Sequence, residues 1–271
     1  MTRRLVVSRE YKVMLLPERF AGSEDDSRHA VDAFWADVGR VLEEIDVPTE
    51  GSFDEVKAHR RIRFLDTAER SLNGHRYIFR ERVDVTSDER EVTLKYRHAD
   101  RYVAQDRDMD SKVKGDDAET KFEEDVKPPF VSVFSYSTSV KIDSDRRFEL
   151  VEDIAELFPG LSAKLDDLDG GDGLAVVGEF CARELVLVGA SLLLGKRDAA
   201  AECAMVIWHH DDDASTPPVC VEFSYKYGDD DEDYRGTVAR DAHDVLRALA
   251  TGLPVWVHPE PATKTAFVYV A

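Results

Sequence analysis

The sequence predicts an α+β fold, with many antiparallel strands and a few helices at the periphery. Several short segments alternate charged and apolar side chains, which is the period-two pattern of a strand. Apolar residues at helical spacing occur in only a few places. Neither an internal repeat nor a long linker divides the chain, so we expect residues 1–271 to form a single domain.

The first expected strand, residues 6–15, sets the pattern for the rest. Ser8, Glu10 and Lys12 fall on one face of it, within an otherwise apolar run. Buried charge is costly unless it is paired or binds something. This strand alone leaves two interpretations open, an exposed sheet face with a cross-strand ion pair or the lining of a cavity.

The remaining elements follow from the same two periodicities. Helices are expected at residues 31–45, 150–158 and 238–251, and a polar loop at residues 104–118. Further strands are expected at residues 61–67, 76–83, 91–97, 119–126, 132–142, 183–194, 202–208, 219–227 and 263–269.

Composition narrows the class of partner. The formal net charge of −20 repels phosphate backbones and anionic lipids, so we expect neither nucleic acid nor membrane as a partner. An anionic small molecule remains possible if basic residues gather in a cavity. The three cysteines, Cys181, Cys203 and Cys220, are widely spaced and indicate a reducing compartment. With no signal peptide or membrane span in the sequence, we expect a soluble, cytoplasmic protein.

Charged residues recur on the strand faces. The carboxylates are Glu10, Glu123 and Glu222, and the cations are Lys12, Arg80, Arg82, Lys95, Arg97, Lys121, Arg183 and Lys226. On a solvated sheet this alternation needs no further explanation. In a closed barrel the same faces converge on a charged lumen, where cations can hold a polyanion and carboxylates a divalent metal.

The order of these motifs resembles the CYTH superfamily, the triphosphate tunnel metalloenzymes. The opening ExExK strand of that family looks like Ser8-Arg9-Glu10-Tyr11-Lys12. The later motifs resemble, in order, Arg63-Phe64-Leu65-Asp66-Thr67, Arg80-Glu81-Arg82, Thr93-Leu94-Lys95, Lys121-Phe122-Glu123, Val221-Glu222-Phe223 and Thr263-Lys264. The resemblance spans nearly the whole chain, although residues 99–118 and 143–180 match poorly.

The resemblance implies an eight-stranded antiparallel β-barrel whose tunnel binds a triphosphate. It gives catalytic roles to Lys12, Arg80 and Arg82. Substrate binding would involve Lys12, Arg80, Arg82, Lys95, Arg97, Lys121, Arg183 and Lys264. The implied cofactor is Mg²⁺ or Mn²⁺, with Glu10, Glu123 and Glu222 as ligands.

Two departures from the family pattern bear on catalysis. Ser8 replaces the first glutamate of ExExK, and Cys220 and Ser224 flank Glu222 where further acids could lie. Fewer carboxylates mean weaker divalent binding. The leading hypothesis is metal-dependent hydrolysis of inorganic triphosphate or a small organic triphosphate. The alternatives are a degenerate protein that binds polyphosphate without turnover, and an exposed charged sheet with an accidental resemblance.

Overall fold

The structure is a computed structural model that describes residues 3–164, 168–210, 217–260 and 263–270. Its strands are β1 (Ser8–Leu15), β2 (Thr49–Glu50), β3 (Glu55–Thr67), β4 (Tyr77–Asp84), β5 (Arg90–His98), β6 (Ala118–Lys127), β7 (Val131–Ile142), β8 (Leu174–Val188), β9 (Ser191–Leu194), β10 (Ala199–His210) and β11 (Cys220–Gly228). Its α-helices are α1 (Glu24–Glu43), α2 (Ser71–Gly74), α3 (Arg101–Gln105), α4 (Val151–Leu157), α5 (Gly236–Gly252) and α6 (Lys264–Val270). Short 3₁₀ helices are η1 (Pro17–Phe20), η2 (Gly115–Asp117) and η3 (Pro159–Lys164).

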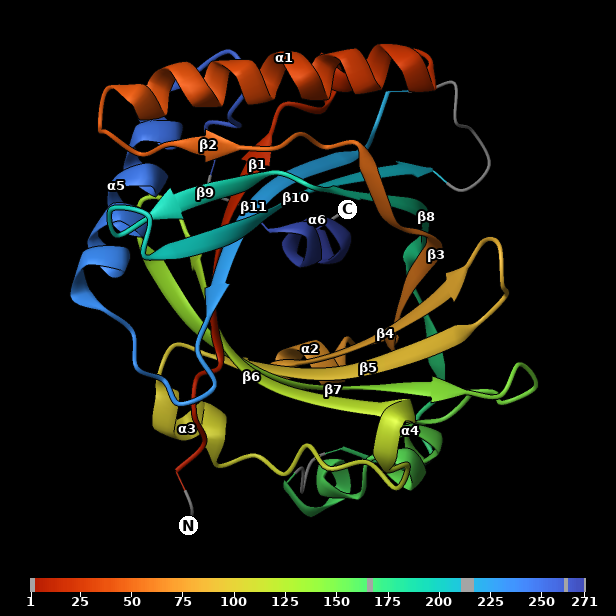
Figure 1. Ribbon diagram of the computed structural model, residues 1–271. Helices are drawn as coiled ribbons and strands as arrows, with labels where there is room; N and C mark the ends of the chain where they lie inside the picture. Colours follow the sequence, from red (N-terminus) through yellow and green to blue (C-terminus); the bar gives the residue numbers. More distant parts are fainter. Residues whose placement is uncertain (1–2, 165–167, 211–216, 261–262, 271) are drawn as a thin grey trace.

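Nine of the strands close into a barrel (Figure 1). Their order is β11-β1-β6-β7-β5-β4-β3-β8-β10, and β10 pairs with β11 to complete the circle. The expected α+β barrel with peripheral helices is therefore confirmed. Two details of the prediction were wrong, because the barrel has nine strands rather than eight and because β1 and β6 pair in parallel.

The barrel has an apolar outer face and a charged inner face. α1 and α5 cover the outside of β1, β10 and β11, where Phe34 of α1 packs edge-on against Phe223, with ring centroids 5.3 Å apart. α4 and η3 cover the outside of β4, β5 and β7, where Phe158 lies against Phe79. The helices thus bury the apolar outer face of the barrel, and the inner face can carry polar side chains.

Helix α1 shows how the sequence specifies one of the helices that pack on the outer face of the barrel. Ser23 and Asp26 form a capping box at its start, with the Ser23 side chain accepting a hydrogen bond from the Asp26 amide. Val31, Phe34 and Val38 then recur at helical spacing on its buried face. The expected helix at residues 31–45 lies mainly within α1, which begins earlier and ends at Glu43.

The chain's last described segment is a helix, and the prediction of a strand at residues 263–269 was wrong. α6 enters the barrel, and its Val268 and Tyr269 are buried against the inner-face residues Phe64 and Trp208 (Figure 1). A segment inside a closed barrel has no sheet edge to join, so it satisfies its backbone hydrogen bonds within itself.

The expected strand at residues 183–194 is two strands, β8 and β9. Between them Gly189 has a φ of +113°, in the region that favours glycine. A Cβ at this position would lie 2.5 Å from the carbonyl oxygen of Ser52. The chain therefore turns here and leaves the barrel.

Two further features concern the whole chain. None of the three cysteines forms a disulfide bond. In the part of the chain that the structure describes, none of the helices combines the length and the apolar character needed to cross a membrane.

Candidate functional site

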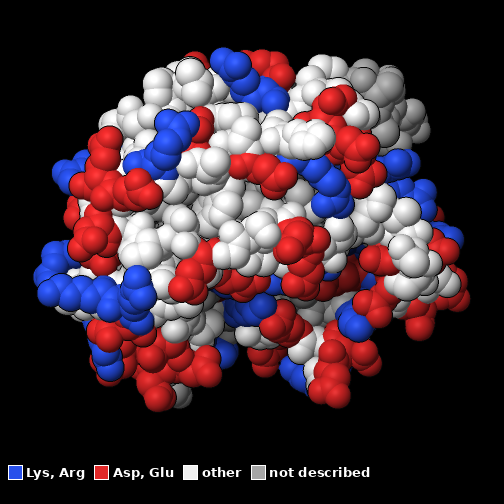
Figure 2. All heavy atoms as spheres, turned by 45° about the horizontal axis from the view of Figure 1, so that its top comes forward, with Lys and Arg blue, Asp and Glu red and all other residues white. Residues whose placement is uncertain are grey.

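A cavity of about 700 Å³ occupies the barrel interior. Among the described residues, eleven Lys or Arg and eight Asp or Glu line it, which gives a formal charge of +3 inside a protein of −20. They are Glu10, Lys12, Lys57, Arg60, Arg80, Arg82, Glu91, Lys95, Arg97, Glu119, Lys121, Glu123, Asp125, Lys127, Glu184, Glu202, Glu222, Lys226 and Lys264. Figure 2 shows the contrast on the outside, where acidic side chains spread over the face that carries α1.

Strand alternation places these side chains inside. On β5, Val92, Leu94 and Tyr96 are buried in the outer core, whereas Thr93 and Lys95 line the cavity. The same period turns the charged residues of the other strands inward, so the barrel and not an exposed sheet is the setting of the charge pattern.

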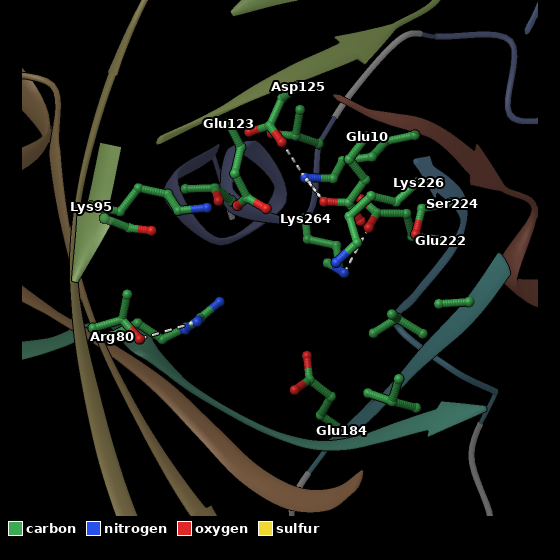
Figure 3. A pocket seen from close by; sticks show the side chains of 18 of the residues that line it. Glu10, Arg80, Lys95, Glu123, Asp125, Glu184, Glu222, Ser224, Lys226 and Lys264 are labelled. Carbon is green, nitrogen blue, oxygen red and sulfur yellow. Dashed lines mark hydrogen bonds and ion pairs between the residues drawn. The ribbon is translucent and has the colours of Figure 1, made fainter. Parts of the chain in front are cut away.

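Arg80 of β4 and Lys95 of β5 form the least compensated part of the cavity. Arg80 donates a hydrogen bond from Nη2 to Thr93 Oγ1 (3.2 Å), while its Nε is buried without a partner. Figure 3 shows both side chains pointing into the cavity from the same side. Among the described carboxylates, none forms an ion pair with either one.

The pKa values of both cations are lowered, as expected for charges with little compensation. The pKa of Lys95 is lowered to about 8, chiefly by burial; Asp125 opposes this shift, and the neighbouring cations Arg97 and Lys12 add to it. Burial likewise lowers the pKa of Arg80, with Arg82 as the next contribution. An anion in the cavity would stabilise the charged form of both groups.

Glu184 of β8 organises a second set of cations. Its Oε1 lies 2.5 Å from Arg60 Nε and 3.4 Å from Arg82 Nη2, and its Oε2 accepts a hydrogen bond from Trp208 Nε1 (2.9 Å). Burial alone would raise the pKa of Glu184, but the two guanidinium groups outweigh it and hold the pKa well below its usual range. Glu184 is therefore an ionised anchor for Arg60 and Arg82.

Across the cavity, β1, β6 and β11 carry the carboxylates Glu10, Glu123, Asp125 and Glu222. Lys12 Nζ lies 2.9 Å from Glu10 Oε2 and 2.6 Å from Asp125 Oδ1. Glu123 accepts a hydrogen bond from Ser8 Oγ (2.6 Å). In Figure 3, Glu10, Asp125 and Glu222 lie on the side facing Arg80 and Lys95.

Helix α6 brings a further cation into the cavity. Lys264 Nζ pairs with Glu222 Oε1 at 2.7 Å, and Thr265 Oγ1 accepts a hydrogen bond from Arg97 Nη1 (3.1 Å). The far end of the helix is held where Tyr269 donates its hydroxyl hydrogen to Asp66 Oδ2 (3.2 Å). The helix thus occupies part of the lumen and supplies one of its charges.

Most residues predicted from the sequence line this one cavity. They are Glu10, Lys12, Arg80, Arg82, Lys95, Arg97, Lys121, Glu123, Glu222, Lys226 and Lys264. Arg183 is not among the lining residues, because its neighbour Glu184 faces inward and adjacent strand residues point to opposite faces. Lys121 is only partly enclosed and pairs with Glu119 (2.8 Å), so it belongs to the margin of the site.

Three important lining residues were not predicted, namely Arg60, Asp125 and Glu184. Asp125 follows Glu123 by two positions on β6, so extending the alternation by one step would have found it. Arg60 precedes the expected strand because β3 begins at Glu55. Glu184 could have been found only by knowing which residues of β8 face inward, and the sequence does not determine this.

The predicted metal ligands do not form a preformed metal site. The described ranges contain no group of three or more His, Cys, Asp or Glu residues placed to hold a metal ion. Glu10, Glu123 and Glu222 line the same cavity but are engaged by Lys12, Ser8 and Lys264, respectively.

Comparison with known proteins adds likenesses of fold at very low identity. No family model matches this chain, and no curated protein does. Among solved structures, a candidate adenylyl cyclase from Hippeastrum, described as having a dominant triphosphatase activity, aligns with 98% of this chain and 95% of its own, at 10% identity and a TM-score of 0.45. A candidate adenylate cyclase from Vibrio parahaemolyticus covers 96% and 95% of the two chains, at 11% identity and a TM-score of 0.35. A protein from Pyrococcus horikoshii covers 93% and 95%, at 11% identity and a TM-score of 0.33.

Proposed function

We propose that the cavity binds a triphosphate-bearing small molecule or inorganic polyphosphate. The observation that carries this proposal is the pair Arg80 and Lys95, two partly buried cations that face the cavity without a described carboxylate partner. An unpaired buried charge is costly, and a phosphate oxygen would supply charge-assisted hydrogen bonds to both groups. The net charge of +3 in the lining favours an anion of matching, multiple charge. The motif order that resembles the triphosphate tunnel metalloenzymes supports the same ligand class.

Thermal unfolding with different anions tests the proposal. A ligand that binds only the folded state raises the melting temperature by mass action. We expect tripolyphosphate to raise it more than monophosphate or sulfate at matched ionic strength. An equal response to all three anions would indicate general salt screening and would contradict a specific site.

Replacing Arg80 or Lys95 by alanine should weaken tripolyphosphate binding by about tenfold or more without unfolding the protein, since each substitution removes a charge-assisted contact. Titration calorimetry measures the affinity, and thermal melting monitors the fold. Arg183→Ala is the matched control because Arg183 does not line the cavity. If Arg183→Ala weakened binding as much as Arg80→Ala, the cavity would not be the binding site.

Metal-dependent hydrolysis is the second candidate. It is favoured by the shared cavity of Lys12, Arg80 and Arg82 with the predicted Mg²⁺ or Mn²⁺ ligands Glu10, Glu123 and Glu222. Because these ligands are engaged by three separate donors, Lys12, Ser8 and Lys264, we assign the protein no metal-mediated step. Phosphate release from tripolyphosphate, measured with Mg²⁺ and with Mn²⁺, distinguishes the candidates. Binding without release in either metal would leave a polyanion-binding protein.

A further inference from the structure

Four of the cavity carboxylates, on β1, β6 and β11, fall into three groups, each with a donor from the protein. Glu10 and Asp125 share the Lys12 ammonium, at 2.9 and 2.6 Å. The remaining two groups are the Ser8–Glu123 hydrogen bond of 2.6 Å and the Lys264–Glu222 ion pair of 2.7 Å. A divalent cation that bound two or more of these carboxylates would have to compete with these donors for them.

Strand register keeps the groups apart. On β11, Glu222 lies opposite Met14, which is four residues from Glu10 on β1. The two positions are about 13 Å apart along the strand, at about 3.3 Å per residue. Lys12 lies between them, opposite Ser224. Since Mg²⁺ holds its oxygen ligands at about 2.0–2.1 Å, Glu10 and Glu222 could share one ion only if both side chains extended towards it and Glu10 gave up its contact with Lys12.

We infer that the Lys12 ammonium takes the place of a divalent cation in this cavity, so that polyphosphate binds without metal. This inference rests on the proposed function and specifies its cation requirement. A lysine ammonium has three N–H donors, and Glu10 and Asp125 accept two of them. The third is available for a phosphate oxygen.

The surroundings of Lys12 keep its charge in place. Burial disfavours the ammonium, but Asp125 and Glu10 outweigh that effect and raise the pKa of Lys12, with a further contribution from Glu222. Arg97 also approaches this group, 3.6 Å from Asp125. Position 8 contributes no charge, because Ser8 donates a neutral hydrogen bond to Glu123. The first motif glutamate would have added a carboxylate here, and its absence lowers the local demand for an external cation.

The direct test is calorimetric titration of the full chain with tripolyphosphate. One series contains a chelator and the other Mg²⁺, and both are analysed by the concentration of metal-free tripolyphosphate. We expect dissociation constants that agree within about twofold. Binding that occurs in Mg²⁺ and disappears in chelator would overturn the inference while leaving the proposed function intact. Failure to bind under both conditions would overturn the proposed function as well.

Lys12→Met tests the role of the ammonium itself. Removing the charge should weaken tripolyphosphate binding in chelator by about tenfold or more. It should also free Glu10 and Asp125, so the ligand-free variant should melt higher in Mg²⁺ or Mn²⁺, whereas the parent should not respond. Affinity and metal response that both match the parent would contradict the inference.

Two further variants separate this role from folding. Lys12→Arg keeps the charge between Glu10 and Asp125, and we expect it to bind tripolyphosphate in chelator even if Lys12→Met does not fold. Lys121→Met removes another cavity lysine, at the margin of the site, and should gain no divalent response. A lost chelator affinity in Lys12→Arg, or a divalent response in Lys121→Met, would overturn the specific assignment to Lys12.

Discussion

Lys95 is a cavity side chain whose charge changes within the ordinary pH range, because its pKa is lowered to about 8, chiefly by burial. Polyphosphate prefers the charged ammonium, so we expect tripolyphosphate affinity to fall as pH rises through 8. In the unfolded chain a lysine titrates near 10.5. The unfolded state therefore binds more protons between these values, and the ligand-free protein should become more stable as pH rises from 8 towards 10.5.

Affinity and unfolding free energy, measured from pH 7 to 9.5, check both directions. Lys95→Arg is the control, because arginine stays charged throughout this range. It should remove most of the affinity loss near pH 8. A variant that kept the parent's pH profile would assign the titration to another group.

Glu184 is the residue on which Arg60 and Arg82 depend. Glu184→Gln removes a buried charge and leaves two guanidinium groups without their main partner, so we expect a loss of about 3 kcal/mol in unfolding free energy. The freed arginines should also make tripolyphosphate stabilise the variant more than the parent. Chemical denaturation with and without the ligand measures both effects.

Glu91→Gln is the matched control for Glu184→Gln. Glu91 pairs with Arg82 at 3.6 Å but is about a third exposed, so its loss should cost less than about 1 kcal/mol. Equal losses in the two variants would mean that Glu184 is not the anchor.

At the scale of elements, a buried hydrogen bond from Tyr269 to Asp66 holds the far end of α6, where Arg70 also contacts the Tyr269 carbonyl oxygen. Tyr269→Phe removes the hydroxyl that donates a hydrogen bond to Asp66, and we expect a loss of about 1 kcal/mol in unfolding free energy. Tyr102→Phe is the control, because Tyr102 is 73% exposed and should change nothing measurable. A Tyr269→Phe variant as stable as the parent would show that the hydrogen bond to Asp66 does not stabilise α6.

Elements with a clear period could be predicted from the sequence, and the others could not. β1, β4 and β5 each carry charged side chains two residues apart on one face, so the inward direction of Lys12, Arg80 and Lys95 could be predicted. On β8 the apolar run Leu185–Val188 hides the phase, and Arg183 was chosen in place of Glu184. α6 is short and apolar, and only the closed barrel around it decides between strand and helix.

Pairing partners were beyond the sequence for a different reason. Lys12 meets Asp125 because β1 and β6 run in parallel, and the sequence contains no local signal for that long-range register. A shared charged face could therefore be predicted, but not the division of its carboxylates among Lys12, Ser8 and Lys264.

At the scale of the whole molecule, the sign of the charge differs between surface and lumen. A protein of −20 repels an approaching polyanion, although the cavity lining carries +3. Raising the ionic strength from about 10 to about 150 mM shortens the Debye length from about 30 to about 8 Å. We therefore expect the association rate of tripolyphosphate to rise with salt.

Stopped-flow fluorescence can follow association, since Trp208 lines the cavity. Sodium chloride is the suitable salt, because sulfate could itself compete for the site. An association rate that fell steeply with salt would show that the lining, and not the acidic surface, controls the encounter.

The parallel strand pair has a consequence for how the molecule is made. β1 lies between β6 and β11, so residues 8–15 can pair only after residues 118–127 and 220–228 have been synthesised. During synthesis the chain emerges from its first residue, and the ring cannot close until the last strand has left the ribosome. Contacts this distant in sequence make folding slow. The chamber that receives the ligand is then among the last features to exist, and a nascent chain that lacks β11 has no enclosed site to offer.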